Sequence, residues 1–458
     1  MNDSSTYNRW WVVVGALIIQ ISLGAVYIWS VFQTPLREAF PTWSEVDVTR
    51  PAQIVLAVFA LAVIVGGRIQ DHVGPRWVAT AGGVLLGLGL ILARGTDRWS
   101  GSAALSWLTF TYAVLGGAGI GLAYVCPIAT AVKWFPDKRG LITGLAVAGF
   151  GAGAFFFAPL ARGLISGRPY ALFGADLFPL PQLGVFRTFL VLGVVFLIAV
   201  VVGAQLLRNP PPGYVPAGWQ PRTGGSAASS GVEMGPRLML STPAFWILWI
   251  TYLAGCAAGL QVIMKASPIW QSFRLAELPP PVPAEEFARI NSAGAMAVSM
   301  LAIFNSLGRI FWGKMSDVIG RRPTLMAMFL ICAAAMLALD RFRVFSLYLL
   351  GVCTVGFCFG GYLALYPAVT ADFFGTKHLG VNYGWMFTAY GVGGLLGPFL
   401  AARLMSVAGR VPYITADGSQ KVFEVANYRP AFLVAGFTCL VAAGLIAALK
   451  RPAPPPTS

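Results

Sequence analysis

One arginine lies deep within a long apolar stretch, and its type and position make it the first candidate for chemistry. Arg309 precedes Asp317 by eight positions in the run FNSLGRIFWGKMSD, so in a helix it lies roughly 12 Å from that polar end. If the stretch crosses a membrane, a guanidinium at this depth costs at least about 2.5–3.5 kcal/mol, which marks it as functional. The alternative is that the flexible side chain reaches the polar end of the helix.

A buried guanidinium favours a carboxylate, which it binds with two parallel hydrogen bonds. With the span boundaries given below, no Asp or Glu falls within an apolar stretch, so a bound anion could supply the missing charge. Asn305 stands four residues before Arg309, on the same face of a helix. It could orient Arg309, bind the anion directly, or make an ordinary bond between helices. The pair predicts a site for a small carboxylate.

Aromatic side chains in the apolar stretches are the second group of candidates. Tyr124, in the run GLAYVCP, is either a core tyrosine with a satisfied hydroxyl or a residue that lines the site. Aromatic residues in such stretches more often serve packing, but a substrate with a methyl group would need an apolar wall. The other possible wall residues are Tyr27, Trp29, Phe150, Tyr362 and Tyr366.

Cysteine and histidine offer little chemistry. All six cysteines fall within apolar stretches without metal-ligand spacing to a histidine, so we interpret them as core residues. The two histidines, His72 and His378, lie in predicted loops. We therefore expect no metal, no cofactor and no Ser-His-Asp site. An enzyme embedded in the membrane is disfavoured for the same reason.

The elements that position these residues follow from composition. Of 458 residues, 57% are hydrophobic and 11% are charged, whereas soluble domains carry about 25% charged residues. Continuous apolar blocks of roughly 17–25 residues predict membrane-spanning helices and not barrel strands, which would alternate. The first block is too long for a secretory signal and no cleavage site follows it, so it counts as a span. The predicted spans are 10–32, 51–67, 77–93, 105–132, 141–165, 185–207, 242–264, 290–312, 324–339, 344–370, 383–402 and 430–449.

The net charge of +15 does not indicate a nucleic-acid partner. Lys and Arg are spread over short loops and form no basic face, so contact with lipid headgroups is the favoured interpretation. The positive-inside rule does not decide the orientation, because about 15 basic residues fall on one set of loops and about 16 on the other. Orientation must rest on motifs.

The chain repeats itself at half its length. Residues 66–77 read GGRIQDHVGPRW, and residues 312–323 read WGKMSDVIGRRP. Asp71 and Arg76 match Asp317 and Arg322 at an offset of 246. The glycines between them, Gly74 and Gly320, permit a tight turn between helices. Each aspartate stands near a helix end, where it could pair with a loop arginine.

A second pair of similar loops supports a division of the chain into two halves. The loop WFPDKRG (134–140) follows the fourth span, and FFGTKHLG (373–380) follows the tenth. Residues 208–240 are rich in Pro, Gly and Ser and are predicted to form a flexible linker. We expect a six-helix bundle at 1–207, a linker at 208–240 and a second bundle at 241–458. In transporters built from parallel halves, the substrate binds between them at mid-membrane.

The pattern G-x-x-x-D-x-x-G-x-R, present twice, resembles the signature loop of the major facilitator superfamily. The resemblance implies a fold of twelve transmembrane helices in two pseudo-symmetric bundles. It places this loop and both termini in the cytoplasm. For Asp71, Arg76, Asp317 and Arg322 it implies a conformational latch and no substrate contact.

A narrower resemblance is to the oxalate/formate antiporter group of that superfamily, which is related to the monocarboxylate transporters. It is carried by TPAFWILW (242–249), ASPIW (266–270), FNSLGRIFWGKMSDVIGRR (304–322), WFPDKRGLITG (134–144) and NYGWMFTAYGVGGLLGP (382–398). The arginine that matches Arg309 binds carboxylate in the group, and the tyrosine that matches Tyr124 lines the site. The resemblance therefore implies a carrier of small carboxylate anions.

One departure bears on the substrate. Oxalate carriers of the group have a lysine in the eleventh helix, where this chain reads FTAYG with Tyr390. A second carboxylate would stay unpaired beside Arg309 alone, which is costly. We therefore favour a monocarboxylate such as lactate, pyruvate or formate over oxalate. Lys265, at the end of the seventh span, could reach inward, although anchoring at the interface is favoured.

The expected mechanism is alternating access, with Tyr124, Asn305 and Tyr390 donating hydrogen bonds to a carboxylate paired with Arg309. Monocarboxylate transporters have an aspartate where this chain has Asn305, so a proton could travel with the weak acid itself. Proton-coupled symport is favoured, with anion exchange of the oxalate/formate type as the alternative. A carrier of sugars or drugs is less favoured, and so is a receptor that binds without transport. We expect a functional monomer in a bacterial inner membrane.

Overall fold

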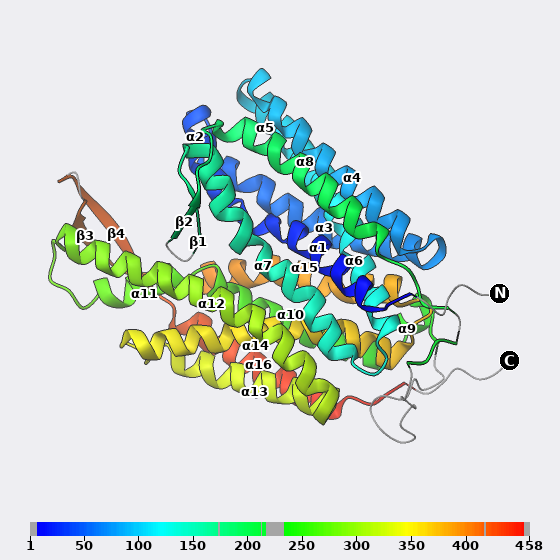
Figure 1. Cartoon of the computed structure of the whole chain (residues 1–458). Helices are drawn as coiled ribbons and strands as arrows, with labels where there is room; N and C mark the ends of the chain where they lie inside the picture. Colours follow the sequence, from blue (N-terminus) through cyan, green and yellow to red (C-terminus); the bar gives the residue numbers. More distant parts are fainter. Residues whose placement is uncertain (1–6, 173–174, 212, 217–232, 416–417, 453–458) are drawn as a thin grey trace. The chain divides into compact units, whose positions relative to one another are not determined.

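Long helices make up most of the chain (Figure 1). The structure is a computed structural model that describes residues 7–172, 175–211, 213–216, 233–415 and 418–452. Within these ranges, eleven helices are long and apolar enough to cross a membrane. A further helix of 26 residues, α15 (Leu379–Leu404), stands where the eleventh span is predicted. The predicted all-α membrane fold is therefore confirmed, and the six cysteines are buried.

The helices that precede the predicted linker begin and end as follows. They are α1 (Trp10–Leu23), the 3₁₀ segment η2 (Gly24–Ile28), α2 (Ser30–Ala39), α3 (Glu45–Val73), α4 (Pro75–Ala93), the 3₁₀ segment η3 (Arg94–Arg98), α5 (Gly101–Leu108), the π-helical segment η4 (Thr109–Gly116), α6 (Gly117–Trp134), α7 (Arg139–Ser166) and α8 (Gly184–Gln205).

The remaining helices follow the same order as the predicted spans, with two short additions. They are α9 (Pro236–Leu240), α10 (Pro243–Ile263), α11 (Ala266–Leu275), α12 (Ala284–Ile319), α13 (Arg321–Leu339), α14 (Phe345–Phe374), α15 and α16 (Arg429–Ala448). Several are longer than predicted, because their polar ends continue as helix beyond the apolar block.

Two predicted spans are interrupted. The first, predicted at 10–32, changes from α1 to the 3₁₀ segment η2 at Gly24, where a Cβ would overlap the carbonyl oxygen of Phe150 in α7. The fourth, predicted at 105–132, contains the π-helical segment η4. This conformation is rare in proteins overall, but where it occurs it is often at a functional site. Composition alone gave no sign of either interruption, since both segments are as apolar as their neighbours.

The repeated loops form the same turn, as predicted. Gly74 ends α3 with φ of 97°, and Gly320 ends α12 with φ of 94°. A side chain at either position would be strained, because L-residues rarely adopt positive φ. The next helix begins at the following residue in both cases, Pro75 and Arg321.

Two antiparallel hairpins join helices. β1 (Tyr170–Leu172) pairs with β2 (Ala175–Phe178), and β3 (Ser406–Ile414) pairs with β4 (Gln420–Asn427) in a register that joins Ser406 to Asn427 and Ile414 to Gln420. The longer hairpin packs on α12, where the ring of Tyr413 stacks on Phe287 with centroids 3.8 Å apart. The predicted spans leave this region unassigned.

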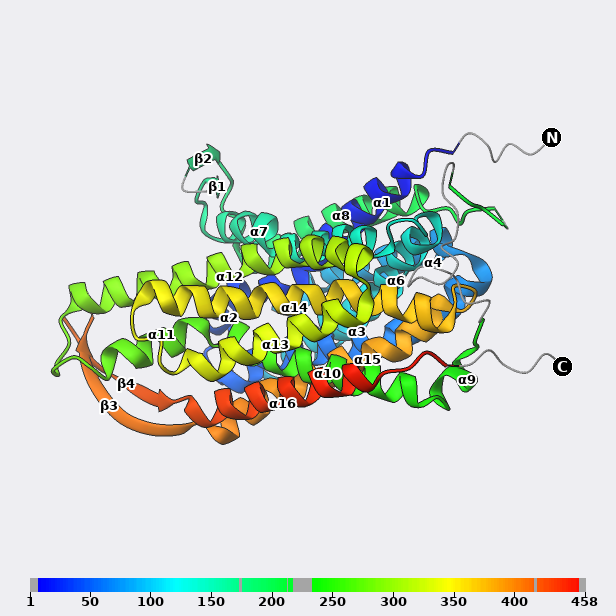
Figure 2. The same ribbon diagram turned by 90° about the horizontal axis from the view of Figure 1, so that it is seen from below.

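Packing divides the chain into two units. The first comprises the described residues up to Thr242 together with Tyr366–Gly391, and the second comprises Pro243–Leu365 and Val392–Arg451. In the first, α4 packs along α8 and α3 along α6. In the second, α13 and α16 lie side by side (Figure 2). Residues 366–391 follow the linker in sequence but pack with the helices that precede it. The division into halves at the linker stays a prediction.

Candidate functional site

Arg309 and Asn305 meet on α12 in the second unit. The Arg309 side chain is 1% exposed, and its Nε donates a hydrogen bond to Asn305 Oδ1 at 3.3 Å. Glycines on α12 and on α14 allow these two helices to approach closely next to Asn305 and Arg309. A Cβ on Gly308 would overlap the carbonyl oxygen of Phe357, and one on Gly360 would overlap that of Asn305. The amide of Asn305 thus contacts the guanidinium, and its role in orienting Arg309 for an anion stays a prediction.

The two predicted wall residues of α14 belong to different units. Tyr362 is buried in the second, and its ring stacks on Phe329 of α13 with centroids 4.6 Å apart and planes 24° apart. It also covers Gly255 of α10, which is the environment of a packing residue. Tyr366 is buried at the start of the α14 segment that packs with the first unit.

An aromatic cluster forms in the first unit and brings together three predicted residues, Tyr124, Phe150 and Tyr390. The Tyr124 ring lies 5.2 Å from that of Phe150 and 4.9 Å from that of Phe387. Phe387 in turn stacks on Tyr390 at 4.9 Å. Phe59 of α3 completes the cluster, 5.1 Å from Tyr124. The side chains come from α3, α6, α7 and α15.

Sequence reasoning missed Phe59 and Phe387. Phe387 precedes Tyr390 by three residues and so shares its helix face, a signal that was present in the run FTAYG. Trp29, predicted as a possible wall residue, points elsewhere. Its indole donates to the carbonyl oxygen of Val48, and its ring packs against Tyr112 and Phe189, as in an ordinary core.

Tyr27 and Tyr390 form a hydrogen-bonded pair at one side of the cluster. Their hydroxyl oxygens are 2.6 Å apart, and the Tyr27 ring packs edge-on against Phe150. Tyr27 lies in the 3₁₀ segment η2, while Tyr390 lies in the part of α15 that packs with the first unit. The two phenols can thus exchange a hydrogen bond but bring no positive charge to this side of the cluster.

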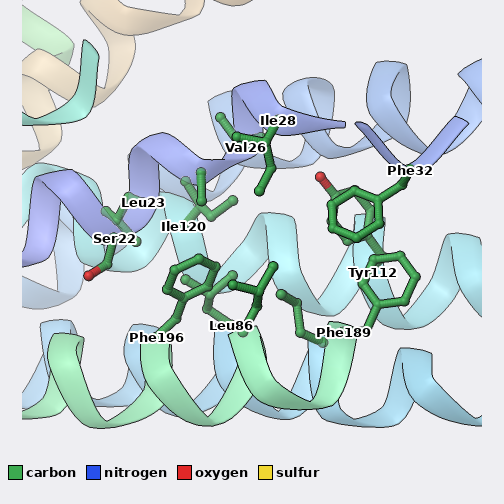
Figure 3. A pocket seen from close by; sticks show the side chains of 13 residues that line it. Ser22, Leu23, Val26, Ile28, Phe32, Leu86, Tyr112, Ile120, Phe189 and Phe196 are labelled. Carbon is green, nitrogen blue, oxygen red and sulfur yellow. The ribbon is translucent and has the colours of Figure 1, made fainter. Parts of the chain in front are cut away.

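A separate cavity lies inside the first unit (Figure 3). It lies between α1, η2, α2, α4, η4, α6 and α8, and apolar side chains such as Leu86, Phe189 and Phe196 form most of its wall. Ser22 and Tyr112 bring its polar side-chain atoms, and the lining carries no charged residue. Such a wall cannot compensate a carboxylate. The cavity is therefore not a suitable site for an anion.

Asp71 binds backbone in place of a loop arginine. Its Oδ1 accepts from the amide of Gly380 at 3.2 Å and its Oδ2 from that of Val381 at 3.0 Å, at the N-terminus of α15. Lys133 Nζ lies 3.9 Å away. A Cβ on Gly67 would overlap the carbonyl oxygen of Gly380, so the two helices meet closely here. A carboxylate is stabilised at such a site by unpaired N–H groups and the helix dipole.

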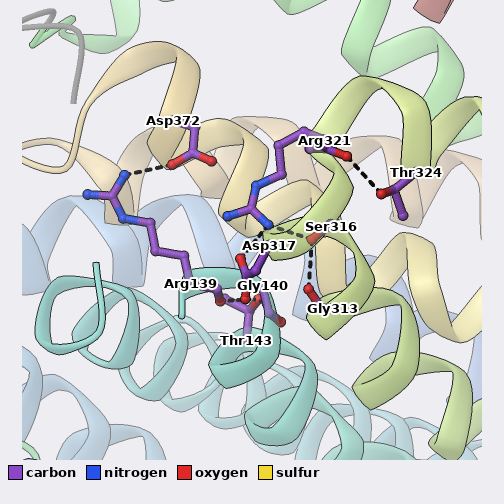
Figure 4. Close-up of polar contacts among 10 residues, drawn as sticks. Arg139, Gly140, Thr143, Gly313, Ser316, Asp317, Arg321, Thr324 and Asp372 are labelled. Carbon is purple, nitrogen blue, oxygen red and sulfur yellow. Dashed lines mark hydrogen bonds and ion pairs between the residues drawn. The ribbon is translucent and has the colours of Figure 1, made fainter. Parts of the chain in front are cut away.

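The two predicted loop arginines hold the last helix before the linker and the last helix of the chain. Arg76 Nε donates to Gln205 Oε1 of α8 at 2.6 Å. Arg322 donates to the carbonyl oxygens of Ile446 and Ala447 of α16. Asp317 instead pairs with Arg321, whose Nη1 lies 2.8 Å from its Oδ1 (Figure 4). The repeat predicted the residues but not these partners.

A buried ion pair was not foreseen. Arg139, at the start of α7, donates to Asp372 Oδ1 at 2.6 Å, and the two side chains are 8% and 2% exposed (Figure 4). No carboxylate lies within the predicted span 344–370, but the helix there, α14, is longer than the span and includes Asp372. The predicted span ends at Thr370, two residues before Asp372, whereas the helix continues to Phe374.

Breaking this pair from one side is expected to destabilise the first unit. Arg139→Met or Asp372→Leu alone leaves an uncompensated buried charge, which costs about 3–5 kcal/mol. The double variant removes both charges and should unfold at a temperature closer to wild type than either single variant. Thermal unfolding of the purified protein in detergent measures this. Additive losses in the double variant would contradict the coupling of the two residues.

Comparison with protein families decides the class. The family model described as Major Facilitator Superfamily matches residues 10–276 and 277–458. The chain belongs to the major facilitator superfamily. It is therefore a multi-pass membrane transporter, in keeping with its apolar helices and its repeated loops.

Two relatives in the superfamily carry names that bear on the substrate. The chain is 28% identical to an oxalate:formate antiporter of Oxalobacter formigenes over 435 residues, covering 92% of this chain and 91% of that protein. It is 27% identical to apicoplast pyruvate carrier 1 of Toxoplasma gondii over 412 residues, covering 80% and 72%. Both names concern small carboxylates.

A solved structure with the same fold is the proton:xylose symporter XylE. It superposes with a TM-score of 0.65 at 13% identity and covers 98% of this chain and 97% of that one. This likeness supports the fold alone.

Proposed function

We propose that this transporter carries small monocarboxylates such as lactate, pyruvate or formate by alternating access, most simply in symport with a proton. The observation that carries the proposal is the buried, Asn305-oriented guanidinium of Arg309. The carboxylate pairs with Arg309, and Tyr124 and Tyr390 add hydrogen bonds and apolar contact. The names of the two relatives, an oxalate:formate antiporter and a pyruvate carrier, support the substrate class.

A monoanion fits the polar groups better than a dianion. Tyr390 brings no positive charge and exchanges a hydrogen bond with Tyr27, so in the proposed site Arg309 is the positive partner of the substrate. A second carboxylate would lose its hydration without a matching charge. Phe59, Phe150 and Phe387 offer the apolar contact that the methyl group of lactate or pyruvate would use.

The latch predicted for Asp71, Arg76, Asp317 and Arg322 becomes part of the same proposal. Asp71 stabilises the N-terminus of α15 in the arrangement seen here, and the cycle would break and re-form this contact. Arg76 and Arg322 tie the turns to α8 and α16 and keep them rigid. We further propose two mobile halves joined at 208–240, cytoplasmic termini, an inner-membrane location and a functional monomer.

The test uses purified protein in liposomes. Radiolabelled lactate uptake is followed with and without an inward proton gradient, and we expect the gradient to stimulate net uptake. Uptake that occurs only when the vesicles are preloaded with another carboxylate would show an exchanger. Asn305, where monocarboxylate transporters have an aspartate, favours this second candidate. No movement of any small carboxylate would refute the proposal and leave an unrelated solute.

A further inference from the structure

The end of the linker is fixed on the turn between α14 and α15. Glu233 Oε1 accepts from the amide of Thr376 at 3.3 Å, and its Oε2 accepts from the amide of Lys377 at 2.8 Å. The next residue, Met234, is 2% exposed and donates its amide to the carbonyl oxygen of Phe374 at 2.9 Å. Asn382 returns a bond from Nδ2 to the Met234 carbonyl at 2.9 Å. Two successive linker residues thus contact both sides of the turn.

The turn depends on such partners. Gly375 adopts φ of 89° and ends α14, and the next residues must find acceptors for amides that no helix satisfies. Glu233 takes two of these amides, and Asp71 takes those of Gly380 and Val381 one turn later. Lys133 lies close enough to both carboxylates for their charges to interact. Two anions from distant parts of the sequence therefore stabilise the start of one helix.

We propose that Glu233 and Met234 are positioning residues for α15, which hold its first turn so that the amides of Gly380 and Val381 reach Asp71. The linker is then a working part of the transporter and not only a connection. Because α15 also carries Tyr390, the anchor defined by Glu233 and Met234 acts on the helix that contributes to the aromatic cluster. The transport consequence rests on the proposed function, but the positioning itself does not.

Hydrogen–deuterium exchange on the full-length protein tests the positioning directly. Glu233→Gln should accelerate exchange at Thr376 and Lys377 and also at Gly380 and Val381, each by roughly fivefold, the size of effect seen when a helix-capping side chain is lost. Asp71→Asn should accelerate exchange at Gly380 and Val381. The double variant should exchange there no faster than Asp71→Asn, since Glu233 acts through Asp71. Glu424→Gln, at an exposed site in β4, is the matched control.

Two results would overturn the inference. Acceleration confined to Thr376 and Lys377 would show a local contact with no effect on the Asp71 site. Acceleration at Gly380 and Val381 that adds to that of Asp71→Asn would show independent action. Should Glu233→Gln fail to fold, Met234→Ala replaces it, with Met239→Ala as its control because Met239 is also buried in this segment; Met234→Ala must then accelerate the same amides.

Transport separates this inference from the proposed function. In liposomes, Glu233→Gln should lower the maximal rate of lactate uptake several-fold with little change in KM. In the proposal Glu233 positions α15 and does not contact the substrate. If wild type moves no carboxylate while the exchange pattern appears, the proposed function fails and the anchor stands. If lactate moves normally and the amide exchange of Glu233→Gln equals that of wild type, the anchor fails and the carrier proposal stands.

Discussion

Arg309→Ala is expected to abolish saturable lactate uptake in proteoliposomes. In the proposed site the guanidinium is the charged partner of the substrate carboxylate, and removing one partner of a buried charge pair costs about 3–5 kcal/mol, or a factor of 100 or more. Arg309→Lys keeps the positive charge but loses the planar fork that binds two carboxylate oxygens. Lactate uptake by Arg309→Lys should be higher than that by Arg309→Ala and well below that of wild type.

Binding can be measured apart from transport. Lactate should raise the unfolding temperature of wild type, since a ligand that binds only the folded state stabilises it, and it should leave that of Arg309→Ala unchanged. Arg410→Ala is the matched control, because Arg410 lies 72% exposed in β3 and pairs with Glu424. Its uptake and its response to lactate should equal those of wild type.

The outcome is decisive for the role of Arg309. If Arg309→Ala folds, as judged by its elution profile and cooperative unfolding, and still takes up lactate with an unchanged KM, then the buried guanidinium is structural. The contact between Arg309 and Asn305 would then be an ordinary hydrogen bond within α12.

Tyr390→Lys is the second change with a large expected effect, and it should turn a monocarboxylate carrier toward dicarboxylates. The lysine would replace a neutral phenol that now shares a hydrogen bond with Tyr27. The lysine ammonium would pair with the second carboxylate of oxalate. With a monoanion bound, the ammonium would stay unpaired among aromatic rings. We expect oxalate uptake to rise at least about tenfold over wild type and lactate uptake to fall by a similar factor, as for one charge-assisted bond.

Tyr390→Phe separates the charge from the hydroxyl. It removes the hydrogen bond to Tyr27 and should reduce lactate uptake about two- to tenfold, the worth of one neutral hydrogen bond, without admitting oxalate. Competition between labelled lactate and unlabelled oxalate measures the preference of each variant. Wild-type protein that already prefers oxalate would contradict the argument from Tyr390, whatever the variants do.

The local features of this chain could be predicted because they depend on neighbouring residues. Low charge and long apolar blocks require helices in a membrane, since each backbone N–H and C=O must then be satisfied within its own segment. Gly74 and Gly320 could be assigned to tight turns because the two loops repeat, and both have positive φ. Arg309 could be placed eight residues before Asp317 on the same helix, which is α12.

Other features were fixed only when distant segments packed together. The partners of Asp71 are backbone amides more than 300 positions away. The sequence does not show which backbone amides will bind a given carboxylate, because every helix N-terminus offers such groups. The pair of Arg139 and Asp372 was hidden for a related reason. The predicted span ends at Thr370, two residues before Asp372, but a charged residue can continue the helix when tertiary packing supplies its counter-ion.

The sequence by itself determined the class of protein, the order of its helices, the two motif turns and the spacing of Arg309 from Asp317 along one helix, because composition and spacing within a helix are enough for each of these. The tertiary structure decided which residues meet: Tyr27 with Tyr390, Glu233 with the α14–α15 turn, and the break in the first span where Gly24 touches α7. Such contacts depend on how closely separate helices approach, and that distance is set by packing across the whole unit.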